Sequence, residues 1–378
     1  MTTSRIAVIY GTRPEAIKMA PLVNALRHIT TLEAVTISTQ QHESLLSETL
    51  GSVGLKTDLE LPTPDRSSVQ SLVSTIGQAL ERPISECDIV VVQGDTVSAY
   101  AGALAGFLQK VPVVHLEAGL RTTDLYQPHP EEGLRRAISR LASLHLAPTD
   151  HAKKNLLREG IPAETIVVTG NTSIDAIKEQ LQNLQTEEIT SNSASGNYCV
   201  LTVHRRENWG DGLDAIARAI SHLAAEFPHV DFICPLHPNP IVRGSFTKPP
   251  KRSNFKVVEP LDHKRFVGLL AASQLILSDS GGIQEEATVL GVPIVILREE
   301  TERPEVVESG WGFIAGTDET QILRIARDLL QQRIGGRFQA PKASPFGDGN
   351  AGTRAAHAIS DFNDGRLSST NAHQRFKS

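Results

Sequence analysis

Two glycine-containing motifs each lie between a short apolar run and a helical pattern. The first is GTRPE at residues 11–15, after the run 6–10, and the second is SDSGGIQEE at residues 278–286. A helix N-terminus that follows a parallel strand binds anions, because its free N–H groups and the helix dipole favour negative charge. Arg13 and Lys18 add positive charge to the first helix. Both motifs indicate phosphate binding, and the alternative for each is a well-capped helix without a ligand.

The second motif contains side chains suited to a nucleotide. Gly281 and Gly282 let a ligand approach the backbone closely, while Ser280 can cap the helix or contact a phosphate. Glu286 lies about one turn into the helix, where a carboxylate can accept hydrogen bonds from a ribose. The alternative is a glycine-rich turn whose acidic residues are favoured by the helix dipole.

Acidic residues follow two other apolar runs. Asp95 comes after the run 88–93, Glu117 follows the next run, and Glu131 and Glu132 open the helix after that. Because the carboxyl ends of parallel strands share one edge of a sheet, Asp95 and Glu117 are expected to converge. Clustered carboxylates suit proton transfer near neutral pH. For any one of these residues the alternative is a strand-end or helix-start charge.

Cationic side chains end strands in the second half of the chain. His204 and Arg205 follow the run 199–203, and Arg303 lies shortly after the run 293–297. A lone histidine is usually structural, but a histidine beside arginines at a strand end is a fair phosphate ligand. We expect these residues to face the same cleft between two domains.

Neither a redox cofactor nor a metal is expected. Gly347, Gly349 and Gly352 spell GxGxxG, but no apolar strand precedes them and too little chain follows for a βαβ unit. Cysteines and histidines do not have zinc-ligand spacing.

The composition describes an ordinary globular chain. It has 378 residues, 40% hydrophobic content and a net charge of −6, without a basic tract for a nucleic acid. Three dispersed cysteines favour a reducing compartment, and no apolar segment approaches the roughly 20 residues that cross a bilayer. We expect a cytoplasmic protein with neither nucleic-acid nor membrane partners.

Short β-branched runs alternate with longer helical patterns along the chain. This alternation predicts α/β domains with parallel sheets, and it restarts after residue 170. Expected strands are residues 6–10, 34–39, 88–93, 111–116, 199–203, 231–235, 256–258, 274–278 and 293–297, and expected helices are 14–28, 41–50, 97–108 and 131–144.

Taken together, the motifs resemble the non-hydrolysing UDP-N-acetylglucosamine 2-epimerase family over nearly the whole chain. The segments that carry the resemblance are GTRPEAIKMAP at 11–21, QGDT at 93–96, HLEAGLRT at 115–122, PEE at 130–132, HRREN at 204–208, HPNP at 237–240, SDSGGIQEEA at 278–287, LGVP at 290–293, TERPE at 301–305 and GDG at 347–349. Any one of these would be weak, but their ordered combination is highly specific.

The resemblance implies a glycosyltransferase-B-like fold with two Rossmann-like domains and the ligand in the cleft. The first domain is expected at residues 1–170, joined by a C-terminal helix at 353–378, and the UDP-binding domain at residues 171–352. The implied reaction interconverts UDP-N-acetylglucosamine and UDP-N-acetylmannosamine, in polysaccharide biosynthesis. Carbon 2 has no adjacent carbonyl to acidify its proton, so elimination and re-addition of UDP explains the need for cations and carboxylates.

The resemblance also implies roles for individual residues. Asp95, Glu117 and Glu131 are acid/base candidates, with His204 beside the diphosphate. The expected substrate-binding residues are Arg13, Lys18, Phe266, Ser280, Gly281, Gly282, Glu286 and Arg303. A second UDP-N-acetylglucosamine, acting as an activator, would contact Gln41, His42, Arg66, Arg205 and His237. A homodimer is implied as well.

One position departs from the family pattern. Relatives read PEE-x-Asn-Arg, whereas this chain has Leu134 in place of the asparagine, on an apolar stripe with Ile138 and Leu141. The change affects the expected rate and substrate more than the reaction type. The alternatives are an epimerase for a di-N-acetylated sugar nucleotide, a hydrolysing epimerase, a glycosyltransferase of the same fold, and a catalytically silent sugar-nucleotide sensor.

Overall fold

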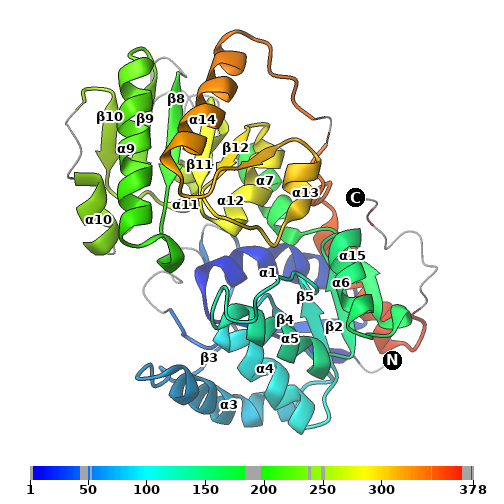
Figure 1. The fold of residues 1–378 in the computed structure, drawn as a ribbon. Helices are drawn as coiled ribbons and strands as arrows, with labels where there is room; N and C mark the ends of the chain where they lie inside the picture. The colour runs from blue at the N-terminus through cyan, green and yellow to red at the C-terminus, as the bar shows by residue number, and fades with distance from the viewer. Residues whose placement is uncertain are drawn as a thin grey trace. The chain divides into compact units, whose positions relative to one another are not determined.

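In the computed structural model the chain forms two compact units: residues 1–176 with 346–378 (unit 1), and residues 177–345 (unit 2) (Figure 1). The structure describes residues 3–42, 50–51, 53–183, 197–236, 240–247, 252–341, 343–367 and 376. Over these ranges, no helix combines the length and the apolar character needed to cross a membrane.

The described part of unit 1 contains a seven-stranded parallel sheet with the strand order β3-β2-β1-β4-β5-β6-β7. Its strands are β1 (Ser4–Tyr10), β2 (Leu32–Ser38), β3 (Leu59–Glu60), β4 (Ile89–Gln93), β5 (Val113–Leu116), β6 (Leu144–Ala147) and β7 (Ile166–Val168). The register pairs Ile6 with Ala34 on one side and with Ile89 on the other. In the central strand β1, residues 6–10 are apolar and buried because both faces of the sheet are covered.

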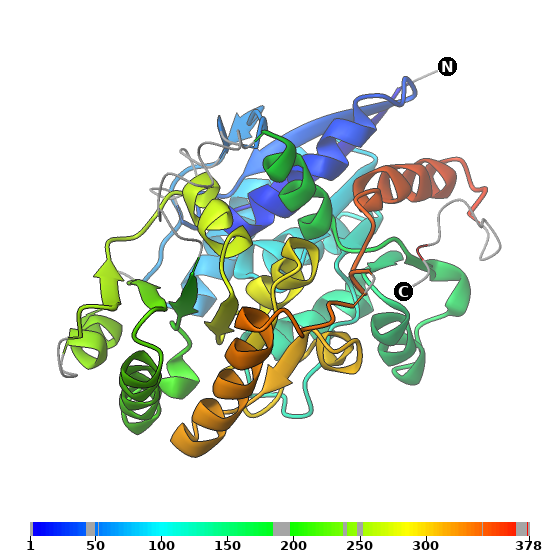
Figure 2. The same ribbon diagram turned by 90° about the horizontal axis from the view of Figure 1, so that it is seen from above.

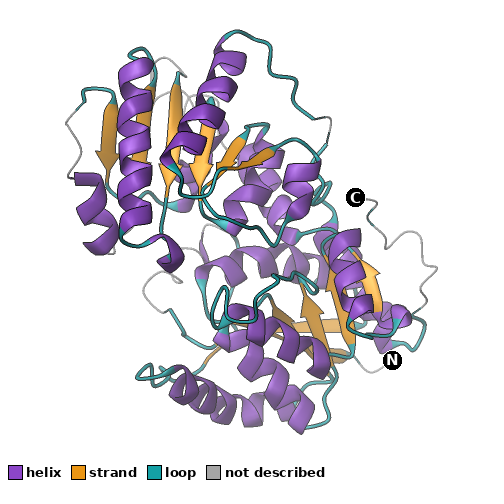
Figure 3. Ribbon diagram, viewed as in Figure 1, coloured by secondary structure: helices purple, strands orange, loops and turns teal. Residues whose placement is uncertain are grey.

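Helices cover both faces of this sheet (Figure 3). They are α1 (Arg13–Leu26), α3 (Val69–Ser85), α4 (Val97–Leu108), α5 (Glu131–Leu141), α6 (Asp150–Arg158), α7 (Thr172–Asn183, which continues into unit 2) and α15 (Ala351–Asn363), with a 3-10 turn at Ala163–Thr165. Alternate residues of β1 point to opposite faces. Val8 packs with α1 and α15, whereas Ile9 packs with α3 and α4.

The helix α15, which lies near the C-terminus, packs against α1 from the start of the chain (Figure 2). Gly352 permits this contact, because a Cβ at that position would lie 2.7 Å from the carbonyl oxygen of Pro21. The helix ends at Asn363, so the expected helical range 353–378 is too long. Gly365 has a φ of 67°, a left-handed conformation that stops the helix.

The described part of unit 2 contains a six-stranded parallel sheet with the order β10-β9-β8-β11-β12-β13. Its strands are β8 (Tyr198–Thr202), β9 (Asp231–Pro235), β10 (Phe255–Val258), β11 (Leu275–Ser278), β12 (Ile294–Ile296) and β13 (Gly312–Ile314). Its helices are α9 (Asp211–Glu226), α10 (Pro240–Thr247), α11 (His263–Ala271), α12 (Gly281–Leu290), α13 (Pro304–Glu308) and α14 (Glu319–Ile334), with a 3-10 turn at Arg206–Asn208. Apolar side chains from α9, α14 and four strands form a core on one face of this sheet.

Both sheets have the parallel, helix-covered architecture expected from the alternation of apolar runs and helical patterns. The helix predicted at residues 97–108 and the strand predicted at 231–235 are confirmed to the residue. The helix predicted at 131–144 is wrong at its end, because α5 stops at Leu141 and Leu144 begins β6. Ala142 has extended backbone, and the N–H of Ser143 pairs with the carbonyl of Val113 in the sheet. Sheet pairing therefore overrides the helical periodicity there.

Candidate active site

The predicted motifs lie beside the point where each sheet reverses its strand order. In unit 1 this point lies between β1 and β4, whose carboxyl ends lead to Arg13 and Asp95. In unit 2 it lies between β8 and β11, whose carboxyl ends lead to His204 and Ser280. Open α/β sheets bind ligands at such switch points, since the two connections diverge there and leave a crevice.

The turn between β1 and α1 is organised by a buried carboxylate. Glu15 accepts hydrogen bonds through Oε2 from the N–H of Gly11 at 3.1 Å and from the N–H of Thr12 at 2.8 Å. Its Oε1 accepts one at 2.6 Å from the hydroxyl of Thr96, which follows Asp95 in the chain. Burial raises the pKa of Glu15 to about 7, against the lowering effect of these hydrogen bonds. Glu15 thus joins the two turns that flank the switch point of unit 1.

Glu117 and Lys18, predicted separately from the sequence, form one ion pair. Glu117 Oε1 lies 2.6 Å from Lys18 Nζ and accepts a hydrogen bond from Asn171 Nδ2 at 3.1 Å. Its other oxygen accepts a hydrogen bond from the side-chain amide of Gln93. The backbone of Glu117 is left-handed, with φ at 65°. The amides of Gln93 and Asn171 were missed, because nothing local in the sequence connects them with Glu117.

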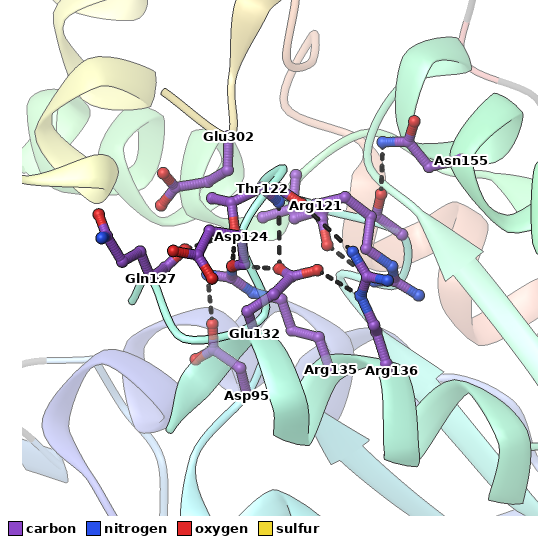
Figure 4. A network of polar contacts seen from close by, with 12 residues as sticks. Asp95, Arg121, Thr122, Asp124, Gln127, Glu132, Arg135, Arg136, Asn155 and Glu302 are labelled. Atoms are coloured by element: carbon purple, nitrogen blue, oxygen red, sulfur yellow. Dashed lines mark hydrogen bonds and ion pairs between the residues drawn. The ribbon is translucent and has the colours of Figure 1, made fainter. Parts of the chain in front are cut away.

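Asp95 belongs to a buried charge network (Figure 4). Its Oδ2 lies 2.6 Å from Nη2 of Arg135, whose Nη1 lies 3.2 Å from Oε2 of Glu132. Glu132 is fully buried and also accepts bonds from the N–H of Thr122 at 3.1 Å and from Nε of Arg136 at 2.8 Å. Arg135 was not predicted as a site residue, because an arginine on a helix is usually a solvated charge and nothing local connects it with Asp95.

Glu131 lies one turn before Arg135 on α5. Its Oε2 is buried and has no hydrogen-bond partner within the part of the chain that the structure describes. A buried carboxylate oxygen without a partner is costly, and such atoms often contact a ligand. Leu134 is half-buried and packs into the core formed with α3 and α4, as its place on the apolar stripe predicts.

His115 supports the turn that carries Asp95. Its Nε2 lies 2.8 Å from the carbonyl oxygen of Gly94, and because a carbonyl only accepts, the nitrogen donates. Burial lowers the pKa of His115 to about 3, so the ring is neutral at neutral pH. The residue was present in the HLEAGLRT motif but received no role from the sequence.

In unit 2 the buried carboxylate of Asp279 shapes the turn after β8. Its Oδ2 accepts hydrogen bonds from the N–H of His204 at 3.0 Å, the N–H of Arg205 at 2.9 Å and Nδ2 of Asn208 at 3.0 Å. The ring nitrogen Nδ1 of His204 lies 3.3 Å from Oδ1 of Asp279, while 37% of the histidine side chain stays exposed. His204 is therefore held at the strand end with part of its ring available to a ligand.

Arg303 lies against the start of α12. A Cβ on Gly281 would lie 2.4 Å from Nη1 of Arg303, so a side chain there would displace the guanidinium from this position. The guanidinium pairs with Glu285 at 2.5 Å and with Glu302 at 2.6 Å, and Glu302 also pairs with Arg298 at 2.7 Å. The predicted cation is thus part of a buried network of alternating charges.

The remaining predicted substrate residues of unit 2 are only partly buried. Glu286 lies on α12, and a Cβ on Gly282 would be 4.0 Å from its Oε1. Phe266 lies on α11 and is half-buried. Both side chains therefore have surface available for contact with a ligand.

Residues predicted for a second sugar-nucleotide site lie in both units. In unit 1, Gln41 Oε1 accepts hydrogen bonds from the N–H and hydroxyl of Ser98 at 3.0 and 2.7 Å. Burial and the nearby charge of Arg66 lower the pKa of His42. Arg205 of unit 2 has a buried Nε without a partner among the described residues, and His237 lies outside them.

The sequence is similar to a known family and to individual proteins along most of its length. The family model described as UDP-N-acetylglucosamine 2-epimerase matches residues 24–360. A probable UDP-N-acetylglucosamine 2-epimerase of Ralstonia solanacearum is 40% identical, over 95% of this chain and 99% of the relative. The UDP-N-acetylglucosamine 2-epimerase of Bacillus subtilis is 39% identical, over 95% and 96%.

Solved structures of proteins with the same description have a similar fold. The crystal structure of the Neisseria meningitidis UDP-GlcNAc 2-epimerase bound to UDP-GlcNAc has a TM-score of 0.90 and 37% identity, and covers 94% of this chain and 100% of that one. A glycosyltransferase structure at 12% identity, with a TM-score of 0.59 and coverage of 97% and 99%, shares the fold.

Two Rossmann-like parallel sheets and these structural neighbours define a protein of the glycosyltransferase-B-like fold class. Within that class, the chain belongs to the UDP-N-acetylglucosamine 2-epimerase family and is an isomerase.

Proposed function

We propose that the protein reversibly epimerises carbon 2 of UDP-N-acetylglucosamine, giving UDP-N-acetylmannosamine through elimination and re-addition of UDP. The observation that carries this proposal is the set of acidic side chains at the carboxyl edge of the unit 1 sheet, in a chain of this family. Asp95 follows β4, Glu117 follows β5 and Glu131 begins α5, so all three belong to connections at that edge.

The proposed chemistry needs proton transfer on both faces of carbon 2. In elimination, a base takes the proton of carbon 2, the C–H electrons form the double bond to carbon 1, and the C1–O electrons leave with UDP. In the reverse step a proton reaches the opposite face of carbon 2 while UDP rejoins carbon 1, so the overall atom balance is unchanged. One group cannot serve both faces, which explains a requirement for more than one of Asp95, Glu117 and Glu131.

The three carboxylates have different surroundings. Glu117 is paired with the ammonium of Lys18, and Asp95 with the guanidinium of Arg135. Glu131 has a buried oxygen without a hydrogen-bond partner within the described residues, which makes it available to a ligand proton. These surroundings support separate roles for the three groups in proton transfer.

We assign binding of UDP chiefly to unit 2. The N-terminus of α12, with Ser280, Gly281 and Gly282, offers backbone N–H groups to the diphosphate, and the half-exposed ring of His204 adds a donor. Phe266 would contact the uracil and Glu286 the ribose hydroxyls.

In unit 1, Arg13 at the start of α1 and Lys18 contribute positive charge toward the diphosphate and sugar. Arg303 supports the start of α12 through its approach to Gly281.

An NMR experiment in deuterated water tests the reaction. The protein is incubated with UDP-N-acetylglucosamine, and carbon 2 is followed. We expect UDP-N-acetylmannosamine with deuterium at carbon 2 and an intact UDP-sugar linkage. Asp95→Asn is expected to lower both epimerisation and exchange while the circular dichroism spectrum stays that of the folded protein.

Other products would contradict the proposal. Free N-acetylmannosamine with UDP would indicate a hydrolysing epimerase. Binding of UDP-N-acetylglucosamine without turnover would indicate a sensor, or another substrate such as a di-N-acetylated sugar nucleotide. Transfer of the sugar to an acceptor would indicate a glycosyltransferase. An Asp95→Asn variant that epimerises at the wild-type rate would contradict the role of Asp95.

We propose in addition that a second UDP-N-acetylglucosamine acts as an activator. Burial, and then the nearby charge of Arg66, lower the pKa of His42, and Arg66 Nη2 donates to the carbonyl of Gln40 at 2.6 Å. This polar cluster supports binding of an anionic ligand. The initial rate with UDP-N-acetylmannosamine as substrate is then expected to rise when a small amount of UDP-N-acetylglucosamine is added, and an unchanged rate would contradict activation.

We propose a homodimer that works in the cytoplasm, in the supply of nucleotide sugars for polysaccharide biosynthesis. Phe107 and Leu108, at the end of α4, are 53% and 69% exposed and support an apolar contact between copies. The three cysteines are free and buried, in keeping with a reducing compartment. Light scattering coupled to size exclusion is expected to give twice the chain mass, and Phe107→Ser to shift the protein toward monomer.

A further inference from the structure

We propose that Arg135 is a positioning residue that orients Asp95 relative to Glu131 for proton transfer, with Glu132 as its buried anchor. The inference rests on the proposed function, because it assumes that Asp95 and Glu131 exchange protons with the sugar. A single helix, α5, carries Glu131 and also the guanidinium that contacts Asp95.

The contact between Arg135 and Asp95 is well defined at both ends. Nη2 of Arg135 lies 2.6 Å from Oδ2 of Asp95, and the arginine side chain is only 7% exposed. Binding through Oδ2 fixes the rotation of the carboxylate and therefore the direction of Oδ1. We assign Oδ1 as the oxygen that exchanges the proton, since Oδ2 is occupied by the guanidinium.

Glu132 holds Arg135 in place from the other side. Its carboxylate lies 3.2 Å from Nη1 of Arg135 and is fully buried. It is itself held by the N–H of Thr122 at 3.1 Å and by Arg136 at 2.8 Å. Arg135 and Arg136 balance the charges of Glu132 and Asp95, so neither carboxylate is left as an unpaired buried charge. A planar guanidinium with several donors can bridge both carboxylates, whereas a lysine ammonium cannot match that fork.

The same helix positions the other candidate directly. Glu131 and Arg135 are four residues apart, so they lie about one turn apart on the same face of α5. Glu131 is placed by the helix backbone, and Asp95 by the arginine one turn later. The spacing between the two candidate proton carriers is therefore set by a rigid helix rather than by the β4–α4 turn alone. Displacement of a reacting group by about 1 Å can reduce a rate by about 100-fold.

Arg136 provides a matched control on the same helix. It also contacts Glu132, at 2.8 Å, but its side chain is 43% exposed and the structure pairs it with Glu132 and the backbone of Thr122 rather than with Asp95. Replacing either arginine by glutamine removes one positive charge from the Glu132 network. Only the Arg135 change removes the contact to Asp95.

The test compares Arg135→Gln, Arg135→Lys and Arg136→Gln by kcat, KM for UDP-N-acetylglucosamine and thermal midpoint. We expect Arg135→Gln to lower kcat by about 100-fold, with little change in KM. Arg135→Lys should recover part of kcat because it restores the positive charge but not the planar fork of the guanidinium. Arg136→Gln should lower the thermal midpoint while kcat stays close to wild type. Equal losses of kcat in the two glutamine variants, or a change confined to KM, would overturn the inference.

A second comparison covers the case in which Arg135→Gln folds poorly. If Arg135 acts through Asp95, adding Arg135→Lys to Asp95→Asn should lower kcat no further than Asp95→Asn alone. Multiplicative losses would overturn the inference while leaving the proposed function intact. A wild-type protein without epimerase activity would instead overturn the proposed function, and the inference with it.

Discussion

Lys18 Nζ lies 2.6 Å from Glu117 Oε1, although the two residues are 99 positions apart in the chain. The ammonium projects from α1, and the carboxylate follows the last residue of β5. Both side chains are largely buried, so the ion pair compensates two charges that are mostly removed from water. This pair joins α1 to one of the proposed proton carriers of unit 1.

Breaking this ion pair from one side should destabilise the protein. Lys18→Met removes the ammonium that pairs with the buried carboxylate of Glu117, and removing one partner of such a pair costs about 3 kcal/mol. The double variant Lys18→Met/Glu117→Gln should recover part of that loss, because no charge is left unpaired. Urea unfolding of the wild type, both single variants and the double variant measures the interaction. Strictly additive losses would show that the pair does not act as a unit.

Glu15 should make stability fall as pH rises toward neutrality. Burial raises its pKa from 4.5 to about 7, so the folded protein retains a proton that the unfolded chain releases. The contribution is fully present below pH 4.5 and is lost as pH rises through 7, by roughly 3 kcal/mol over that window. Urea unfolding at pH 5 and pH 7.5 should show a flatter dependence for Glu15→Gln than for the wild type. Identical slopes would contradict the raised pKa.

Gly281 and Gly282 are neighbours that should respond differently to alanine. A Cβ on Gly281 would lie 2.4 Å from Nη1 of Arg303, whereas a Cβ on Gly282 would have its nearest neighbour, Glu286 Oε1, at 4.0 Å. We expect Gly281→Ala to destabilise the protein by about 2 kcal/mol, because Arg303 must move out of its pairs with Glu285 and Glu302. Gly282→Ala should leave the thermal midpoint equal or slightly higher. Differential scanning calorimetry measures both, and equal losses would refute the steric account.

Leu134 is the position where the resemblance predicts a departure from the family pattern, and its packing predicts the effect of replacing it by asparagine. Leu134→Asn replaces a half-buried apolar side chain in the core with α3 and α4, so the free energy of unfolding should fall by about 1 kcal/mol. Leu134→Met, of similar volume, should cost less than that. We expect both variants to retain epimerisation at carbon 2. Hydrolysis or complete loss of turnover in folded Leu134→Asn would show that this position decides the reaction type.

Local patterns in the sequence were sufficient to predict the architecture. Short, mostly buried strand segments such as residues 231–235 and apolar helical segments such as residues 97–108 each extend over few residues. Their sequence patterns therefore determine the elements almost independently of the rest of the chain. Alternation of these elements determines parallel sheets, and parallel strands bring their carboxyl ends to one edge. Asp95 and Glu117 can therefore be grouped from the order of residues along the chain alone.

Tertiary structure decided which charged groups face each other. The contacts of Lys18 with Glu117 and of Arg135 with Asp95 join residues far apart in sequence. They depend on the strand order and on the face of the sheet against which each helix packs. The end of α5 was also decided there, because pairing of Ser143 with Val113 replaces a further helical turn. Residue type and spacing therefore indicate which groups can do chemistry, whereas long-range packing sets their partners and their orientation.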